Sequence, residues 1–194
     1  MPVPPGDVVG GPTTKATQKA LKDLVDRLTI DEDGGLRLDG LPTLILSASV
    51  FRSIQQESER ILGRGASAVL YLSGEAWGRD AGARLVAAAK GTSLESTIER
   101  LQSQSLIRGF GRLEIVSFNP ETGNAVIRFH NSPFAATGGS SNRPMCQLTA
   151  GFLAGVVGAF VGEEMLVAER TCRAMGADVC EFRADRLGRL TKGV

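Results

Sequence analysis

The chain has 194 residues and a formal net charge of +1, from 22 Lys and Arg residues against 21 Asp and Glu residues. Apolar residues make up 42% of the chain and aromatic residues only 5%, a composition typical of a globular protein. The balanced charge argues against a basic nucleic-acid-binding surface, and the few aromatic rings argue against a platform for base stacking. We therefore expect no nucleic-acid partner.

The composition along the chain predicts a single domain with two loose ends. Residues 1–14, rich in Pro and Gly, are predicted to form a flexible arm, residues 15–184 the domain, and residues 185–194 a polar tail. The first residues show no positive charge followed by an apolar stretch, so we expect no secretory signal and a cytoplasmic protein. The longest apolar run, residues 148–162, is shorter than the roughly 20 residues that span a bilayer, so it predicts a buried helix rather than a membrane span.

The first half of the chain is predicted to be mainly helical, because apolar residues recur there at helical spacing. The predicted helices span residues 15–28, about 47–62, 66–89 and 93–107. A short strand is predicted between the first two, over residues 36–41. In the third helix small residues recur every fourth position and form a stripe that another backbone can approach closely: Gly74, Gly78 and Gly82. In the fourth helix the leucines and isoleucine are predicted to face inward: Leu94, Ile98, Leu101 and Leu106.

The second half of the chain adds short strands and one apolar helix. Alternating residues predict strands over 113–116 and 125–129, joined by a hairpin turn at 119–124. A loop at 136–144, a helix over 145–162 and strands over 165–170 and 179–183 are predicted to follow. This order of elements predicts an α/β (α+β) fold with a small antiparallel sheet packed by helices.

The three cysteines all lie in the last quarter of the chain. Glu169, Cys172 and Cys180 form the pattern E-x2-C-x7-C, with Gly176 where the chain must reverse. A hairpin there would bring the two sulfurs together, and Cys146 at the start of the apolar helix would supply a third. Three thiolates and one carboxylate make a tetrahedral zinc site, so the pattern indicates a structural zinc centre on Cys146, Glu169, Cys172 and Cys180.

The spacing alone leaves three other interpretations of these cysteines open. They could be three reduced thiols in a core, since free cysteine is often buried. They could hold an iron–sulfur cluster, although such clusters usually have four cysteines. Cys172 and Cys180 could also form a redox pair, although the C-x-x-C motif is absent.

Residues 146–182 resemble the signature of the 4-vinyl reductase domain family. The resemblance rests on a Cys that opens a Gly-rich helix (Cys146, with Gly151 and Gly155), an E-x-x-C strand end and a final C-x-F. The stretch "NSPFA" at 131–135 resembles the family's segment before the first Cys. The resemblance implies the ligand-binding fold of the NO-signalling and Golgi-transport type, in which helices pack on an antiparallel sheet, often in a homodimer.

The resemblance also implies a function. In the aromatic-sensing regulators of the family, the matching three Cys and one Glu bind zinc beside a buried ligand pocket. Other members belong to bacteriochlorophyll synthesis, and stand-alone members are often called hydrocarbon-binding proteins. We therefore expect a homodimeric sensor or carrier that contains zinc and binds an apolar, aromatic or tetrapyrrole-like molecule. The candidate pocket residues are Tyr71, Trp77, Phe129, His130 and Phe152.

Two alternatives to a binding domain follow from the same resemblance. One is an enzyme, or an accessory to an enzyme, in 4-vinyl reduction of a (bacterio)chlorophyll precursor. However, the sequence has no dinucleotide fingerprint for hydride chemistry, and four protein ligands would leave zinc no open position for water. We therefore expect no catalytic residues. The other alternative is a dimeric scaffold that holds no ligand.

Overall fold

A computed structural model describes residues 15–190 of the chain. The predicted N-terminal arm, residues 1–14, and the end of the predicted tail, residues 191–194, lie outside the described residues. The chain divides into two compact units, of which one ends at Ile45 and the other begins at Leu46. All the predicted metal ligands and pocket residues belong to the second unit.

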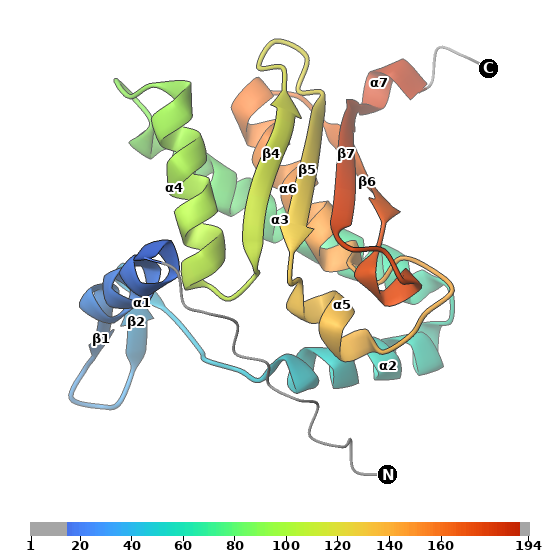
Figure 1. Ribbon diagram of the computed structural model, residues 1–194, viewed down its shortest axis with the longest axis horizontal. Coiled ribbons are helices and arrows are strands. Elements are labelled where there is room, and N and C mark those ends of the chain that lie inside the picture. The colour runs from blue at the N-terminus through green and yellow to red at the C-terminus, as the bar shows by residue number, and fades with distance from the viewer. Residues whose placement is uncertain (1–14, 191–194) are drawn as a thin grey trace. The chain divides into compact units, whose positions relative to one another are not determined.

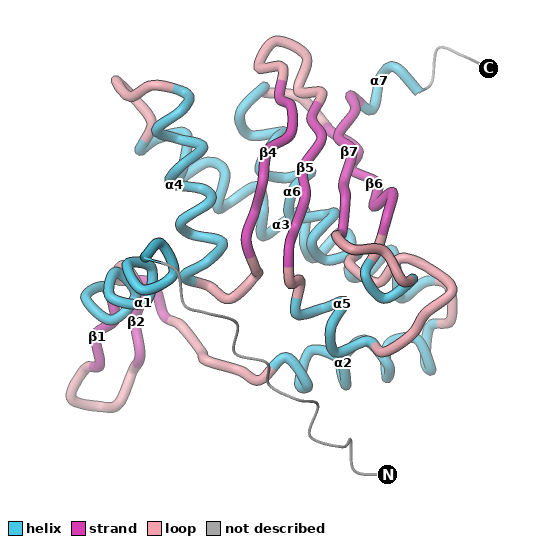
Figure 2. The backbone as a smooth tube through the Cα atoms, viewed as in Figure 1, coloured by secondary structure: helices cyan, strands magenta, loops and turns pink. Residues whose placement is uncertain are grey.

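The first unit combines one helix with a small antiparallel sheet (Figure 2). Its elements are α1 (Lys15–Arg27), β1 (Leu28–Ile30), β2 (Leu36–Leu38) and β3 (Leu41–Pro42), and the strand order is β1-β2-β3. The helix predicted over residues 15–28 is confirmed. The strand predicted over 36–41 is divided between β2 and β3, because Asp39 and Gly40 have φ of 55° and 75° and turn the chain.

The second unit contains helices and a four-stranded antiparallel sheet with the order β4-β5-β7-β6 (Figure 1). The strands are β4 (Arg112–Phe118), β5 (Ala125–His130), β6 (Met165–Thr171) and β7 (Cys180–Arg186). The helices are α2 (Ala48–Leu62), α3 (Gly65–Ala88), α4 (Leu94–Ile107), α5 (Pro133–Gly138), α6 (Gln147–Val161) and α7 (Leu187–Leu190), with a 3-10 turn η1 (Arg173–Met175). The predicted α+β class is confirmed.

The hydrophobic core of this unit lies between the sheet and α6. Helix α6 packs on one face of the sheet and α3 packs on α6, so both helices lie behind the strands in Figure 1. Ala125, Ile127 and Phe129 alternate along β5 and are all buried in this core. Because α6 has the sheet on one side and α3 on another, nearly all of its surface is buried. This explains why its sequence is apolar all round.

Glycines on both helices allow α3 and α6 to cross closely, as the glycine stripe predicted. A Cβ atom at Gly82 would lie 2.7 Å from the Cβ atom of Ala159, and one at Gly74 would lie 2.9 Å from the backbone nitrogen of Phe152. On the other side of the crossing, a Cβ atom at Gly151 would overlap the carbonyl oxygen of Tyr71. Real side chains do not tolerate such distances, so this crossing requires glycine on both helices.

Two segments differ from the sequence-based expectations. Helix α5 begins before the predicted loop 136–144 and takes its first residues; Pro133 lies in its first turn, where no backbone N–H is needed. Residues 185–190 of the predicted tail belong to the end of β7 and to α7. Strand β7 continues to Arg186, because Asp185 pairs with Leu166 and Arg186 pairs with Met165 of β6.

Candidate metal centre and ligand cavity

Four predicted metal ligands come from three neighbouring elements of the second unit. Cys146 is the residue that precedes α6, Glu169 lies on β6, Cys172 follows the end of β6 and Cys180 begins β7. Between the last two, η1 and Gly176, with φ of 93°, reverse the chain as the sequence predicted. We call these four residues the Cys3Glu cluster.

The ligand atoms of the Cys3Glu cluster converge on one point. One sulfur or carboxylate oxygen from each residue lies within 4.8 Å of all the others, and the three cysteines are buried and free of disulfides. The sulfurs of Cys146 and Cys180 are 3.7 Å apart, much farther than the about 2.05 Å of a disulfide bond. Two thiolates that each lie about 2.3 Å from a tetrahedral zinc ion would be roughly 3.8 Å apart. The spacing therefore suits a shared metal ion.

The carboxylate of Glu169 gives a second test of whether a metal fits here. Its Oε2 accepts a hydrogen bond of 2.9 Å from the backbone N–H of Cys146, whereas its Oε1 is buried without a hydrogen-bond partner among the described residues. Burial raises the pKa of Glu169 to about 7, against the lowering effect of the Cys146 N–H. A buried oxygen with no partner is costly, and a cation would supply the missing partner.

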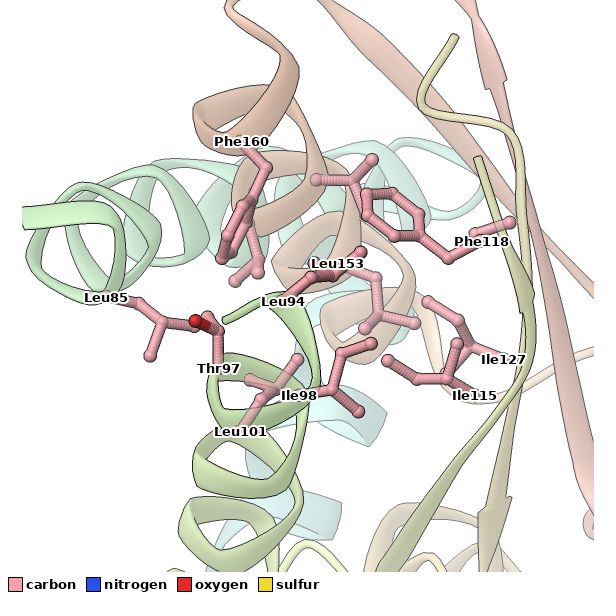
Figure 3. A pocket seen from close by; sticks show the side chains of 13 residues that line it. Leu85, Leu94, Thr97, Ile98, Leu101, Ile115, Phe118, Ile127, Leu153 and Phe160 are labelled. Atoms are coloured by element: carbon pink, nitrogen blue, oxygen red, sulfur yellow. The ribbon is translucent and has the colours of Figure 1, made fainter. Parts of the chain in front are cut away.

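In addition to the metal centre, the second unit contains an apolar cavity between α4, the sheet and α6 (Figure 3). Its volume is about 40 Å³, and it opens partly to solvent. The lining comes from α3, α4, β4, β5 and α6: Leu85, Leu94, Thr97, Ile98, Leu101, Ile115, Phe118, Ala125, Ile127, Leu153, Val156, Val157 and Phe160. The inward face predicted for residues 93–107 thus forms one wall of the cavity.

The atoms of the lining that face the cavity are all apolar. Thr97 is the one polar residue in the lining, and its hydroxyl donates a hydrogen bond of 3.0 Å to the carbonyl oxygen of Ser93. The other lining side chains are aliphatic or aromatic hydrocarbons. A ligand in this cavity would therefore be held by shape and by exclusion of water.

The candidate pocket residues lie elsewhere in the second unit. Trp77 and Phe152 contact each other, with ring centroids 4.5 Å apart. Tyr71 accepts a hydrogen bond from the backbone N–H of Val167, and burial raises the pKa of its hydroxyl. Phe129 packs edge-on against Phe182 in the core.

His130, the fifth candidate, forms a side-chain hydrogen bond on the sheet. Its Nε2 lies 2.7 Å from a carboxylate oxygen of Glu114 on β4, and this hydrogen bond lowers the pKa of Glu114. The residues that do line the cavity were not candidates, because an aliphatic side chain looks the same in sequence whether it faces a core or a cavity. The only sequence feature that indicated part of the lining was the helical spacing of apolar residues over 93–107.

Among residues 15–190, no helix is both long enough and apolar enough to cross a membrane. The most apolar helix, α6, is a core helix of the second unit.

Several solved structures share this fold. The phenol-responsive sensory domain of the transcription activator PoxR is 19% identical, with a TM-score of 0.75, and the match covers 91% of this chain and 92% of that domain. A vinyl-4-reductase family protein from Methanocaldococcus jannaschii is 22% identical, with a TM-score of 0.53 and coverage of 75% and 83%. Subunit 3 of a trafficking protein particle complex from Naegleria fowleri, covalently bound to palmitic acid, is 12% identical, with a TM-score of 0.55 and coverage of 72% and 92%.

A search of curated protein sequences found no match to the chain. In contrast, residues 125–186 match the family model of the 4-vinyl reductase domain. The matched residues run from β5 to the end of β7 and contain the whole Cys3Glu cluster. The chain therefore carries a 4-vinyl reductase domain, as the motif over residues 146–182 predicted.

Proposed function

We propose that this protein is a ligand-binding domain of the sensor or carrier type, which holds a small apolar molecule in the cavity beside α4 and a structural zinc ion in the Cys3Glu cluster. The observation that carries the proposal is the position of α6. This helix follows the first cysteine of the cluster and forms a wall of the apolar cavity.

The donor set of the cluster supports zinc. Soft thiolate ligands select zinc, copper(I) or iron–sulfur clusters, and three sulfurs with one carboxylate suit a tetrahedral zinc ion. Such a closed set leaves no position for a water nucleophile, so the role that we propose for the ion is structural. It would join the start of α6 to β6 and β7.

The lining of the cavity supports a hydrocarbon as the ligand. A phenol would bury its hydroxyl without a partner, which costs about 1–3 kcal/mol. The cavity volume of about 40 Å³ is also well below the roughly 300–1,000 Å³ that is usual for ligand pockets. We therefore infer a small monocyclic or aliphatic molecule rather than a tetrapyrrole.

Titration of the protein with toluene and with phenol, followed by calorimetry, tests this proposal. Toluene is expected to bind at least about tenfold more tightly, because a factor of ten corresponds to about 1.4 kcal/mol. Equal or tighter binding of phenol would contradict the inferred ligand class. The absence of binding by both molecules, and by aliphatic probes of similar size, would contradict a ligand-binding function.

A matched pair of alanines tests whether the ligand occupies this cavity. Ala125 on β5 lines the cavity, whereas its register partner Ala184 on β7 does not. Ala125→Val places two extra methyl groups in the hollow and is expected to weaken toluene binding. Ala184→Val adds the same groups elsewhere in the core. If both variants bind toluene as the unchanged protein does, the ligand does not occupy this cavity.

We also propose that the protein is a homodimer in the cytoplasm. Large apolar side chains are exposed on α2 and α3, including Ile54, Ile61, Val69 and Leu72, and exposed apolar patches often mark protein interfaces. Size-exclusion chromatography with light scattering is expected to give twice the chain mass of 20.5 kDa. Leu72→Lys is expected to shift the protein toward monomer, whereas an unchanged mass would place the interface elsewhere.

A further inference from the structure

The segment "NSPFA" at 131–135 contains a buried serine whose hydroxyl has an unusual partner. Ser132 is the N-cap residue of α5, a position where a serine hydroxyl normally accepts a hydrogen bond from a backbone N–H of the first helical turn. Here the hydroxyl makes no such bond. The residue is only 2% exposed, so its hydroxyl does not face bulk solvent.

The hydroxyl of Ser132 instead contacts the Cys3Glu cluster. Its Oγ lies 3.6 Å from the Sγ atom of Cys146, and this sulfur is its one hydrogen-bond partner among residues 15–190. A hydroxyl hydrogen rotates to suit its acceptor, and a metal-bound thiolate can only accept. In the metal-bound protein, the direction of this hydrogen bond is therefore set: Ser132 donates and Cys146 accepts.

Two of the other three ligands of the cluster, Cys180 and Glu169, also receive protein donors. The backbone N–H of Arg173 donates to the sulfur of Cys180 at 3.4 Å, and the backbone N–H of Cys146 donates to Glu169 at 2.9 Å. Three thiolates and one carboxylate carry more negative charge than a divalent ion offsets. Donors from outside the cluster disperse the excess and fix the orientation of each ligand. Of the three donors, only that of Ser132 belongs to a side chain, so mutation can remove it.

We propose that Ser132 is a positioning residue of the metal centre, which orients the Cys146 thiolate and tunes its electron density through an O–H···S hydrogen bond. The inference rests on the metal site of the proposed function. It explains why the hydroxyl is buried beside a sulfur instead of capping α5.

The test uses the full-length protein loaded with Co²⁺, whose sulfur-to-metal charge-transfer absorption reports on the thiolates. Ser132→Ala removes the donor and makes the sulfur more electron-rich, so the charge-transfer band is expected to move to longer wavelength. Competition with a chromophoric chelator is expected to show a roughly 10- to 100-fold weaker affinity for Zn²⁺, the usual effect of losing such a partner. Ser132→Gly lacks the same hydroxyl and suits an N-cap position, so it provides a second variant if the first fails to fold. Ser132→Thr retains the hydroxyl and is expected to retain the band position.

Ser105→Ala is the matched control. Ser105 is also a buried serine, and its hydroxyl donates to the carbonyl oxygen of Gly111, outside the cluster. This variant is expected to lose thermal stability without any change in the Co²⁺ spectrum or in Zn²⁺ affinity. A folded Ser132→Ala or Ser132→Gly variant with unchanged spectrum and affinity would overturn the role of Ser132 alone. An unmodified protein that binds neither ion would instead overturn the metal centre of the proposed function, and the role of Ser132 with it.

Discussion

Individual residues of the Cys3Glu cluster are expected to contribute to stability mainly through the metal. The cluster brings together buried groups that would repel one another as anions. A divalent cation bound between them would make the net electrostatic interaction attractive. Because the four ligands converge only in the folded protein, the free energy of metal binding adds to the free energy of folding.

Cys180→Ser is therefore expected to lower the melting temperature by roughly 10 °C, since a chain of this length changes by about 2–4 °C for each kcal/mol. The melting temperature of each protein is measured with and without a chelator. This comparison separates the contribution of the metal to stability from the cost of burying the new serine hydroxyl. The unmodified protein is expected to lose stability with chelator, and the variant to respond much less. The same chelator response in both proteins would show that Cys180 does not bind the ion.

A different outcome is expected at His130, which the sequence indicated as a pocket residue. Its side chain is paired with Glu114 and is absent from the lining of the cavity. His130→Asn is therefore expected to change the dissociation constant for toluene by less than about twofold, as measured by calorimetry, because each tenfold change needs about 1.4 kcal/mol. A large loss of affinity would mean that the ligand reaches the sheet at β5 instead.

At the scale of the elements, the close crossing of α3 and α6 depends on glycine at the contact points. Gly151→Ala is expected to lower the free energy of unfolding by about 1–3 kcal/mol or more, because the new methyl group would meet the backbone of α3 at Tyr71. Gly65→Ala, in the first turn of α3, is the matched control. A Cβ atom there would lie at an ordinary 3.7 Å from Leu62. Urea unfolding measures the free energy of unfolding of both variants. Equal losses in the two variants would mean that α3 and α6 can move apart to accommodate the new methyl group.

The elements that the sequence predicted correctly share a strong local signal. Periodic apolar residues located α2, α3, α4 and α6 to within two residues at each end, and the alternation in β5 identified its buried face. The first residues of α5 had no such signal, because "PFAAT" is too short to show a period. Strand β1 has only three residues, two of them exposed, so its pairing with β2 left no alternating pattern.

At the scale of the whole second unit, α6 links the proposed metal centre to the cavity. Cys146 lies at its start, and Leu153 and Val156, two to three turns later, line the cavity. Because binding couplings are reciprocal, removal of the metal is expected to weaken toluene binding, and toluene is expected to tighten metal binding. Calorimetry on metal-loaded and metal-free protein measures the coupling. Identical toluene affinities would show that the two sites are independent.

The sequence by itself determined the 4-vinyl reductase domain motif of residues 146–182, the antiparallel α+β class and the four residues of the Cys3Glu cluster. Each of these depends on residue types at fixed spacings: glycines every fourth residue, alternating strands, and cysteines on either side of a reversing glycine. The location of the cavity, the apolar character of its lining and the contact between Ser132 and Cys146 were decided only by the tertiary structure. A leucine in a core and a leucine beside a hollow have the same local sequence. The difference between them arises from how closely α4, α6 and the sheet approach one another, which depends on packing between residues that are distant in the chain.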